Sequence, residues 1–187
     1  QTVESFTRTI KQAIALNPDR LVTFSYAHVP WVNKSQLILE KAGLPASEVK
    51  SNMYDSARQT LKSAGYLPVG LDHFVRPDDE LYTALQTKAL HRNFQGYCTR
   101  RTTGQVYAFG VTGISQLSTA YSQNIKDIAG YIEQINSGTF AVVKGYSLTR
   151  EEQITREAIE SLMCNGSLDW EERADQFNIP VEEFRAA

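Results

Sequence analysis

Apolar residues in the first part of the chain follow a helical spacing. They recur at steps of three and four residues: Val3, Phe6, Ile10, Ala13 and Ile14. This spacing places one apolar stripe along a helix, which we expect Pro18 to end. The β-branched and aromatic residues of 20–27 then predict a buried strand. A helix followed by a short turn and an apolar strand is half of a β/α unit, so this order favours a parallel sheet.

The same helix-then-strand order recurs after a loop that contains proline. Ser47 is a candidate cap for a helix whose apolar residues repeat every four positions, and Gly65 suits the position just after that helix. A strand is predicted over 66–74. Pro77 and the acidic residues 78–80 then predict a third helix, because proline fits a first turn and acids favour its positive end.

The pattern changes in the second half of the chain. The predicted elements are a loop over 91–104, a strand over 105–111, a helix over 125–135 and a strand over 139–148. Thr149 and Glu152 have the spacing of a capping box, which starts a further helix. Two short helices are predicted around Pro180.

These elements predict an α/β protein in two parts. Residues 1–120 form the β/α part, and residues 121–187 begin a mainly helical part. The chain enters a helical pattern almost at its first residue and finishes inside an amphipathic helix. We therefore expect it to be a piece of a longer protein.

Composition and charge exclude several classes of function. Apolar residues make up 42% and charged residues 21% of the 187 residues, which is ordinary for a globular domain. The net charge of −2 gives no electrostatic reason to expect nucleic acid or an anionic membrane as partner. No apolar run approaches the roughly 20 residues that span a bilayer. Cys98 and Cys164 match no metal-ligand or disulfide spacing, so we expect reduced thiols and a cytoplasmic protein.

Polar residues with possible chemistry gather where predicted strands end. Four clusters stand out, at residues 24–30, 70–77, 91–97 and 110–115. All three histidines fall in them, near four arginines: Arg76, Arg92, Arg100 and Arg101. Each cluster alone has a plain structural interpretation, as a loop contact, a local pair or a solvated helix start. Together, arginine forks, histidines and aromatic rings suit a flat apolar ligand that carries carboxylates. The three dispersed histidines predict no metal site.

The same clusters resemble one enzyme family, the oxygen-independent coproporphyrinogen III oxidases, which are radical S-adenosylmethionine enzymes. The matching segments, in order, are 24–30 (Phe-Ser-Tyr-Ala-His-Val-Pro), 70–74 (Gly-Leu-Asp-His-Phe), 76–81 (Arg-Pro-Asp-Asp-Glu-Leu), 91–97 (His-Arg-Asn-Phe-Gln-Gly-Tyr) and 162–165 (Leu-Met-Cys-Asn). The resemblance implies the last β/α units of an open, incomplete barrel, followed by the start of a helical domain. It implies oxidative decarboxylation of two propionates of coproporphyrinogen III to vinyl groups, which gives protoporphyrinogen IX in heme biosynthesis.

Site residues follow from this resemblance and from charge. By the resemblance, Ala27 and Ile114 match positions that contact bound S-adenosylmethionine, and Phe94 and Gln95 match residues beside the same site. Charge and position add a hypothesis of our own for the groups that bind the substrate carboxylates: Asp72, His73, Arg76, Arg92 and Asn93.

The chain departs from the family in its cysteines. The family binds a 4Fe-4S cluster through a Cys-x-x-x-Cys-x-x-Cys motif, which is absent here. We therefore expect the longer parent to use S-adenosylmethionine, the cluster and an external electron donor, and this chain alone to bind no cluster, catalyse nothing and self-associate. Two alternatives stay open: a heme-trafficking relative, and a non-catalytic module that binds tetrapyrroles or other partners.

Overall fold

The computed structural model describes residues 1–99 and 105–186. The chain divides into two compact units, Gln1–Thr83 (unit 1) and Ala84–Ala187 (unit 2). The predicted domain boundary at residue 120 falls inside unit 2, at the start of a strand, and it remains a prediction about the longer protein.

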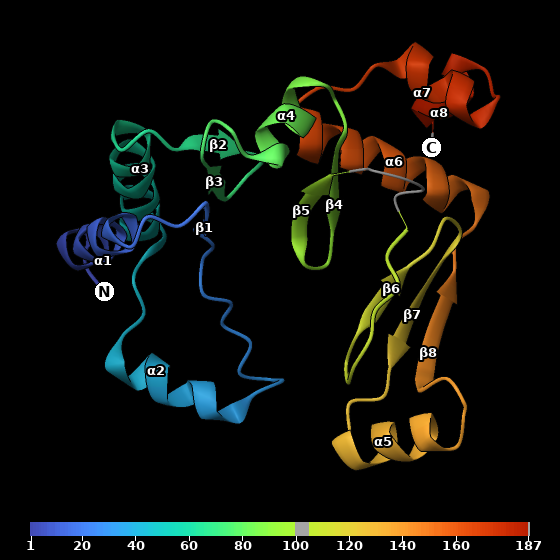
Figure 1. The fold of residues 1–187 in the computed structure, drawn as a ribbon, viewed down its shortest axis with the longest axis horizontal. Helices are drawn as coiled ribbons and strands as arrows, with labels where there is room; N and C mark the ends of the chain where they lie inside the picture. Colours follow the sequence, from blue (N-terminus) through green and yellow to red (C-terminus); the bar gives the residue numbers. More distant parts are fainter. Residues whose placement is uncertain (100–104, 187) are drawn as a thin grey trace. The chain divides into compact units, whose positions relative to one another are not determined.

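Two helices that pack side by side carry the core of unit 1. Helix α1 (Val3–Ala15) begins with a capping box between Thr2 and Ser5, and α3 (Ser47–Ser63) lies against it (Figure 1). Their apolar stripes and the adjoining sheet share one buried cluster: Ile10, Ala57, Leu61, Tyr66 and Phe74. Both helices are confirmed as predicted. Ser47 does not cap α3, because it is the first helical residue and the N-cap Ala46 has no side-chain cap.

The sheet of unit 1 differs from the prediction. Its strands β1 (Arg20–Val22), β3 (His73–Val75) and β2 (Leu67–Val69) lie in that order, and both pairs are antiparallel. The expected parallel pairing is therefore wrong for this sheet. The predicted strand 66–74 is two strands rather than one, because Gly70 adopts a positive φ of 60° and turns the chain back on itself. The predicted strand 20–27 ends at Val22.

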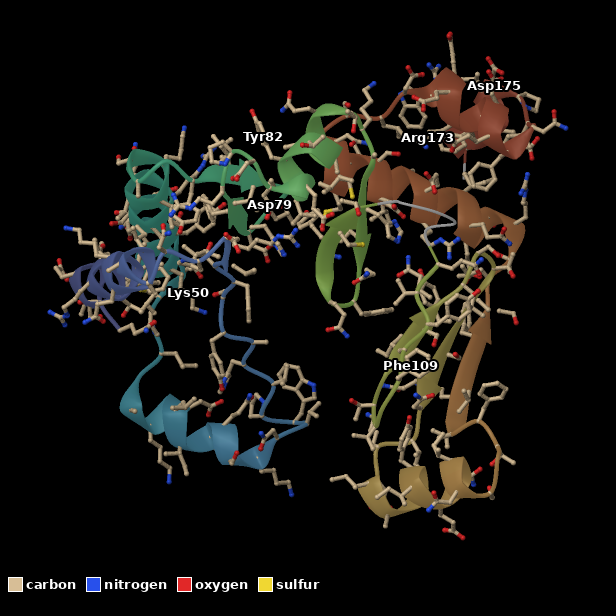
Figure 2. The ribbon with its side chains drawn as sticks, viewed as in Figure 1. Lys50, Asp79, Tyr82, Phe109, Arg173 and Asp175 are labelled. Atoms are coloured by element: carbon tan, nitrogen blue, oxygen red, sulfur yellow. The ribbon has the colours of Figure 1, made fainter. Side chains whose placement is uncertain are left out.

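The rest of unit 1 is loop and short helix. A 3₁₀ turn (Lys34–Gln36) leads into α2 (Leu37–Ala42), and the third predicted helix is α4 (Glu80–Gln86). Asp79, labelled in Figure 2, precedes α4 and accepts a hydrogen bond from the Leu81 N–H at 2.7 Å. The same carboxylate receives Arg20 Nε at 2.6 Å, so one side chain joins β1 to the start of α4.

Unit 2 opens with a hairpin that the sequence did not predict. Strands β4 (Leu90–Asn93) and β5 (Gly96–Thr99) pair antiparallel within the predicted loop 91–104. The remainder of that loop, residues 100–104 with Arg100 and Arg101, lies outside the described residues. Among the residues that the structure describes, this hairpin joins no further strand.

A second antiparallel sheet follows, of strands β6 (Ile114–Gln116), β7 (Ala120–Asn124) and β8 (Val142–Ser147) in that order. The predicted strand 105–111 is wrong, since only Val106 makes a bridge, to Gln116. Helix α5 (Ile128–Asn136) and strand β8 are confirmed near their predicted positions. Residues 121–187 thus contain strands as well as helices.

Three helices complete unit 2: α6 (Arg150–Asn165), α7 (Trp170–Phe177) and α8 (Val181–Ala186). The predicted capping box of Thr149 and Glu152 starts α6, and the pair of short helices around Pro180 is confirmed. Ile154, Ala174 and Phe184 form the core of these helices. In the described part of the chain, no helix has the length and apolar character to cross a membrane.

Candidate functional site

The candidate site residues of unit 2 lie on and around the β4–β5 hairpin. At its tip, the Asn93 side chain accepts a hydrogen bond from the Gln95 N–H at 2.7 Å, which fixes the turn. The Asn93 amide also donates to the Cys98 sulfur at 3.4 Å. The Asn93 side chain therefore stabilises the hairpin turn, in which Phe94 and Gln95 are exposed.

Phe94 contacts one aromatic neighbour and is otherwise largely exposed. Its ring meets the Tyr121 ring edge-on, with centroids 5.8 Å apart. The side chain is nevertheless 61% exposed. A largely exposed ring that is held by an aromatic neighbour is a surface against which a planar ring of a ligand can pack.

The register of the second sheet relates Ile114 to this ring. Ile114 lies opposite Gln123, and Gln116 lies opposite Tyr121. Directly opposed residues point to the same face, and so do residues two apart along a strand, so Ile114 and Tyr121 share one face. The structure thus places Phe94 and Ile114, two of the residues assigned to S-adenosylmethionine, on one face of the β6–β7 pair. Nothing in a linear pattern of residues indicated Tyr121 as their link.

The hairpin itself is fixed to helix α6. The buried ring of His91, on β4, hydrogen-bonds through Nδ1 to the Glu160 carboxylate. On β5, the Tyr97 hydroxyl donates to the Met163 carbonyl at 2.9 Å. Arg92 lies between them along the chain but is exposed, with its guanidinium 5.9 Å from the centre of the Tyr97 ring. Arg92 is the predicted substrate residue of this unit whose charge faces solvent.

Unit 1 holds the second group of candidates, which are paired with their neighbours. Asp72 Oδ1 lies 2.7 Å from His73 Nδ1, and the His73 side chain is only 10% exposed. The Asp72 carbonyl accepts the Thr23 N–H at 2.8 Å, which ties the β2–β3 turn to the chain after β1. This arrangement fixes the orientation of the His73 ring.

Arg76 is held by an aromatic ring. Its guanidinium lies 4.8 Å from the centre of the Tyr66 ring, and the Tyr66 hydroxyl donates to the Pro18 carbonyl at 2.7 Å. A half-buried arginine stacked on a fixed ring keeps its fork in a defined plane, which is how carboxylates are bound in bidentate fashion.

Ala27 lies in an exposed loop that one side chain holds in place. Gln36 donates from Nε2 to the Ala27 carbonyl at 3.3 Å and accepts the Val29 N–H at 2.7 Å. His28, next in the chain, contacts Glu40 through Nε2 at 2.7 Å. Both links are to the start of the α2 region, so this loop has a defined conformation without belonging to a strand.

An open apolar pocket of about 650 Å³ lies beside this loop in unit 1. Its walls come from α1, from the loop after β1, from the end of α2 and the residues after it, and from α3; they include Phe6, Phe24, Tyr26, Leu44, Met53 and Tyr54. No local pattern of residues predicts this pocket, because its lining comes from segments far apart in the sequence.

The two groups that the resemblance implies fit this chain unequally. A 4Fe-4S cluster needs several thiolates around one corner, and the chain has only Cys98 and Cys164. Among residues 1–99 and 105–186, no three histidine, cysteine or acidic side chains gather closely enough to hold a metal ion. The chain therefore does not fit the cluster. S-adenosylmethionine fits better, since the face shared by Phe94 and Ile114 offers an open aromatic ring to its adenine.

Comparison with known proteins gives a consistent result. No family model matches the chain. The chain is 40% identical over 186 residues to the oxygen-independent coproporphyrinogen III oxidase of Salmonella typhimurium, and 39% identical to that of Escherichia coli. The enzyme of Helicobacter pylori strain J99 is 40% identical over 179 residues.

These matches cover 96–100% of this chain but only 39–40% of each relative, so the chain spans about two-fifths of their length. The solved structure titled as coproporphyrinogen III oxidase from Escherichia coli, a radical SAM enzyme, matches with a TM-score of 0.88 and 39% identity. The match covers 100% of this chain and 43% of the chain in the solved structure. The chain is therefore homologous, along its whole length, to a part of the oxygen-independent coproporphyrinogen III oxidases.

Proposed function

We propose that the longer protein to which this chain belongs is an oxygen-independent coproporphyrinogen III oxidase of heme biosynthesis. The observation that carries the proposal is the match along the whole chain, at 39% identity and a TM-score of 0.88, to a solved enzyme of that name. We infer that this chain forms the last β/α units of an open barrel and the start of a helical domain. Two free thiols suit the reducing cytoplasm.

The proposed reaction converts two propionate side chains of coproporphyrinogen III to vinyl groups. S-adenosylmethionine, when bound, supplies the group that abstracts a hydrogen atom. Each propionate then loses that hydrogen, one electron and carbon dioxide, and a carbon–carbon double bond remains. The electron leaves to an acceptor outside this chain, and an external donor starts the reaction. The residues present here bind and orient, and the cluster belongs to the rest of the longer protein.

We assign roles to the candidate residues as follows. Ala27, Ile114, Phe94 and Gln95 contact S-adenosylmethionine. Arg76 and Arg92 bind substrate carboxylates, supported by Asp72, His73 and Asn93. The exposure of Arg92 and the position of the Arg76 guanidinium over the Tyr66 ring support these assignments.

The test is an anaerobic assay of the longer protein with coproporphyrinogen III, S-adenosylmethionine and a reductant. Vinyl products and released carbon dioxide support the oxidase. Heme binding without vinyl product favours the alternative, a heme-trafficking relative or a non-catalytic tetrapyrrole-binding module. Arg92→Ala should raise the KM for the porphyrinogen, whereas Arg8→Ala, an exposed arginine on α1, should not. Equal kinetics for both variants would remove Arg92 from the proposed site.

We further propose that the 187-residue chain by itself binds no 4Fe-4S cluster, has no oxidase activity and self-associates. Large apolar side chains are almost fully exposed in it, among them Phe109 at 90% (Figure 2) and Phe140 at 91%. Anaerobic reconstitution with iron and sulfide should leave the chain without a stoichiometric cluster. Light scattering after gel filtration should show species above 21.0 kDa. A brown stoichiometric cluster or a clean monomer contradicts the corresponding part.

A further inference from the structure

One side of helix α6 contacts both the three-stranded sheet and the β4–β5 hairpin of unit 2. Its contacting residues are Glu152, Arg156, Glu160 and Met163, at steps of four, four and three. Residues three and four apart lie on the same side of a helix. The four contacts therefore form one row along α6.

The first half of this row binds the three-stranded sheet. The Tyr146 hydroxyl of β8 donates to the Glu152 carboxylate. Arg156 donates to the Leu117 carbonyl at 3.1 Å and also to the Ser118 carbonyl, both in the turn between β6 and β7. The Arg156 guanidinium lies 5.8 Å from the centre of the Tyr121 ring. The sheet face that carries Ile114 and Tyr121 is thus fixed to α6.

The second half of the row binds the β4–β5 hairpin, through Glu160 to His91 and through the Met163 carbonyl to Tyr97. An isolated two-stranded hairpin is at best marginally stable in water. Since the described residues add no third strand, packing on α6 has to hold this hairpin in place. The His91 and Glu160 side chains are 4% and 11% exposed, so their contact is shielded from water.

We propose that His91 and Glu160 are a positioning pair for S-adenosylmethionine, an inference that rests on the proposed function. The pair does not touch the ligand. It sets the hairpin on the same helix that holds the β6–β7 sheet, and so fixes Phe94 and Gln95 relative to Ile114. Phe94 is three residues beyond His91 on the same strand and turn, about 10 Å away along an extended chain. A shift of the hairpin at His91 therefore moves the ring on which the ligand stacks.

The experiment uses the longer protein with its cluster reconstituted. His91→Phe keeps the ring and removes both nitrogens, whereas His91→Asn keeps an amide close to the Nδ1 position and should rescue the contact. Ile154→Val is the control. Ile154 is buried on α6 in the separate cluster with Ala174 and Phe184, so this substitution lowers stability away from the hairpin. Glu160→Ala is the second disrupting variant, because it removes the carboxylate that His91 contacts.

Three quantities are measured for each variant: the Kd for S-adenosylmethionine, its KM, and amide hydrogen exchange over residues 92–98. His91→Phe and Glu160→Ala should raise Kd and KM about tenfold or more, as expected for misplaced contacts, and should speed exchange in the hairpin. His91→Asn should stay within about threefold of wild type. Ile154→Val should lower the melting temperature and change none of the three quantities.

Two results overturn the proposal. One is that His91→Phe and Glu160→Ala bind the ligand as wild type does, with unchanged exchange in the hairpin. The other is that Ile154→Val weakens binding as much as they do, because the effect would then be general destabilisation. Wild-type protein that binds no S-adenosylmethionine overturns the proposed function together with this inference, whereas normal wild-type binding with unaffected variants overturns the positioning role alone.

Discussion

Leu61→Ala should strongly destabilise the core of unit 1. Leu61 is fully buried on α3 and packs with Ile10, Tyr66 and Phe74. Its carbonyl also accepts the Tyr66 N–H at 3.0 Å, where α3 ends and the chain turns into β2. The side chain therefore lies at the junction of the two helices and the sheet.

The expected loss can be worked from this burial. Leucine has about three more carbons than alanine, each worth about 0.8 kcal/mol when buried, which gives roughly 2.4 kcal/mol. The cavity left among neighbours on two helices and a strand adds to this, so the total should be about 3–4 kcal/mol. The urea midpoint should then fall by about 2 M, since m is about 1–3 kcal/mol per molar for small proteins.

The assay is urea unfolding followed by circular dichroism, with hydrogen exchange on peptides of α1 and α3 to assign the change to unit 1. Leu16→Ala is the matched control, because Leu16 is 83% exposed at the end of α1 and should change stability by less than about 0.5 kcal/mol. If Leu61→Ala shifts the midpoint no more than Leu16→Ala does, the packing assigned to this core is wrong.

Three further predictions concern the surface. The hydrogen bond between Tyr146 and Glu152 raises the pKa of the tyrosine above its ordinary 10.0 and lowers that of the carboxyl below its ordinary 4.5. This hydrogen bond therefore stabilises the fold fully between pH 4.5 and pH 10.0. Its stabilisation is lost as pH falls through the lowered pKa of Glu152 or rises through the raised pKa of Tyr146. The melting temperatures of Tyr146→Phe and wild type should differ most between about pH 5 and 9 and converge outside that window. Arg20→Met removes the ion pair with Asp79 and should lower the free energy of unfolding by about 1 kcal/mol. The loss should be smaller in 1 M salt, because the Arg20 side chain is 40% exposed and salt screens the pair. Unfolding titrations at two salt concentrations that show the same loss contradict this. Phe94→Ala should leave the melting temperature of the longer protein within about 1 °C and weaken S-adenosylmethionine binding, measured by equilibrium dialysis, because the ring is 61% exposed; unchanged binding counts against its role.

Helices were predictable here because their signals are local. Each signal lies within a few residues of the helix that it specifies. Examples are the spacing of three and four in α1, the capping box of Thr149 and Glu152 at the start of α6, and Gly65 after α3. Gly65 has a φ of 86°, its N–H bonds to the Lys62 carbonyl, and the next N–H bonds to that of Leu61, which is the closing pattern that a glycine at this position favours.

Strands were less predictable because their partners are distant or their turns unusual. In the predicted strand 66–74, apolar residues lie on both sides of Gly70, and the turn that starts at this glycine separates β2 from β3. The β4–β5 hairpin turns at Phe94 and Gln95, which lack the Asn-Gly signal of a two-residue hairpin loop. Its buried residues His91 and Tyr97 are polar enough to suggest a loop, and they bond to residues of helix α6 that lie 69 and 66 positions further along the chain.

The same contrast changes which candidate residues should touch a ligand. Histidine and acidic residues are the usual candidates for ligand contact in a sequence. In this structure Asp72 is paired with His73, and His91 with Glu160, and both histidine rings are largely buried. Buried pairs of this kind orient their surroundings, and removing one partner disturbs the other. The accessible surfaces belong to less conspicuous residues such as Phe94, whose side chain is 61% exposed. Ligand contact is therefore better supported for the exposed aromatic and arginine side chains, while the buried histidines hold the segments that present them.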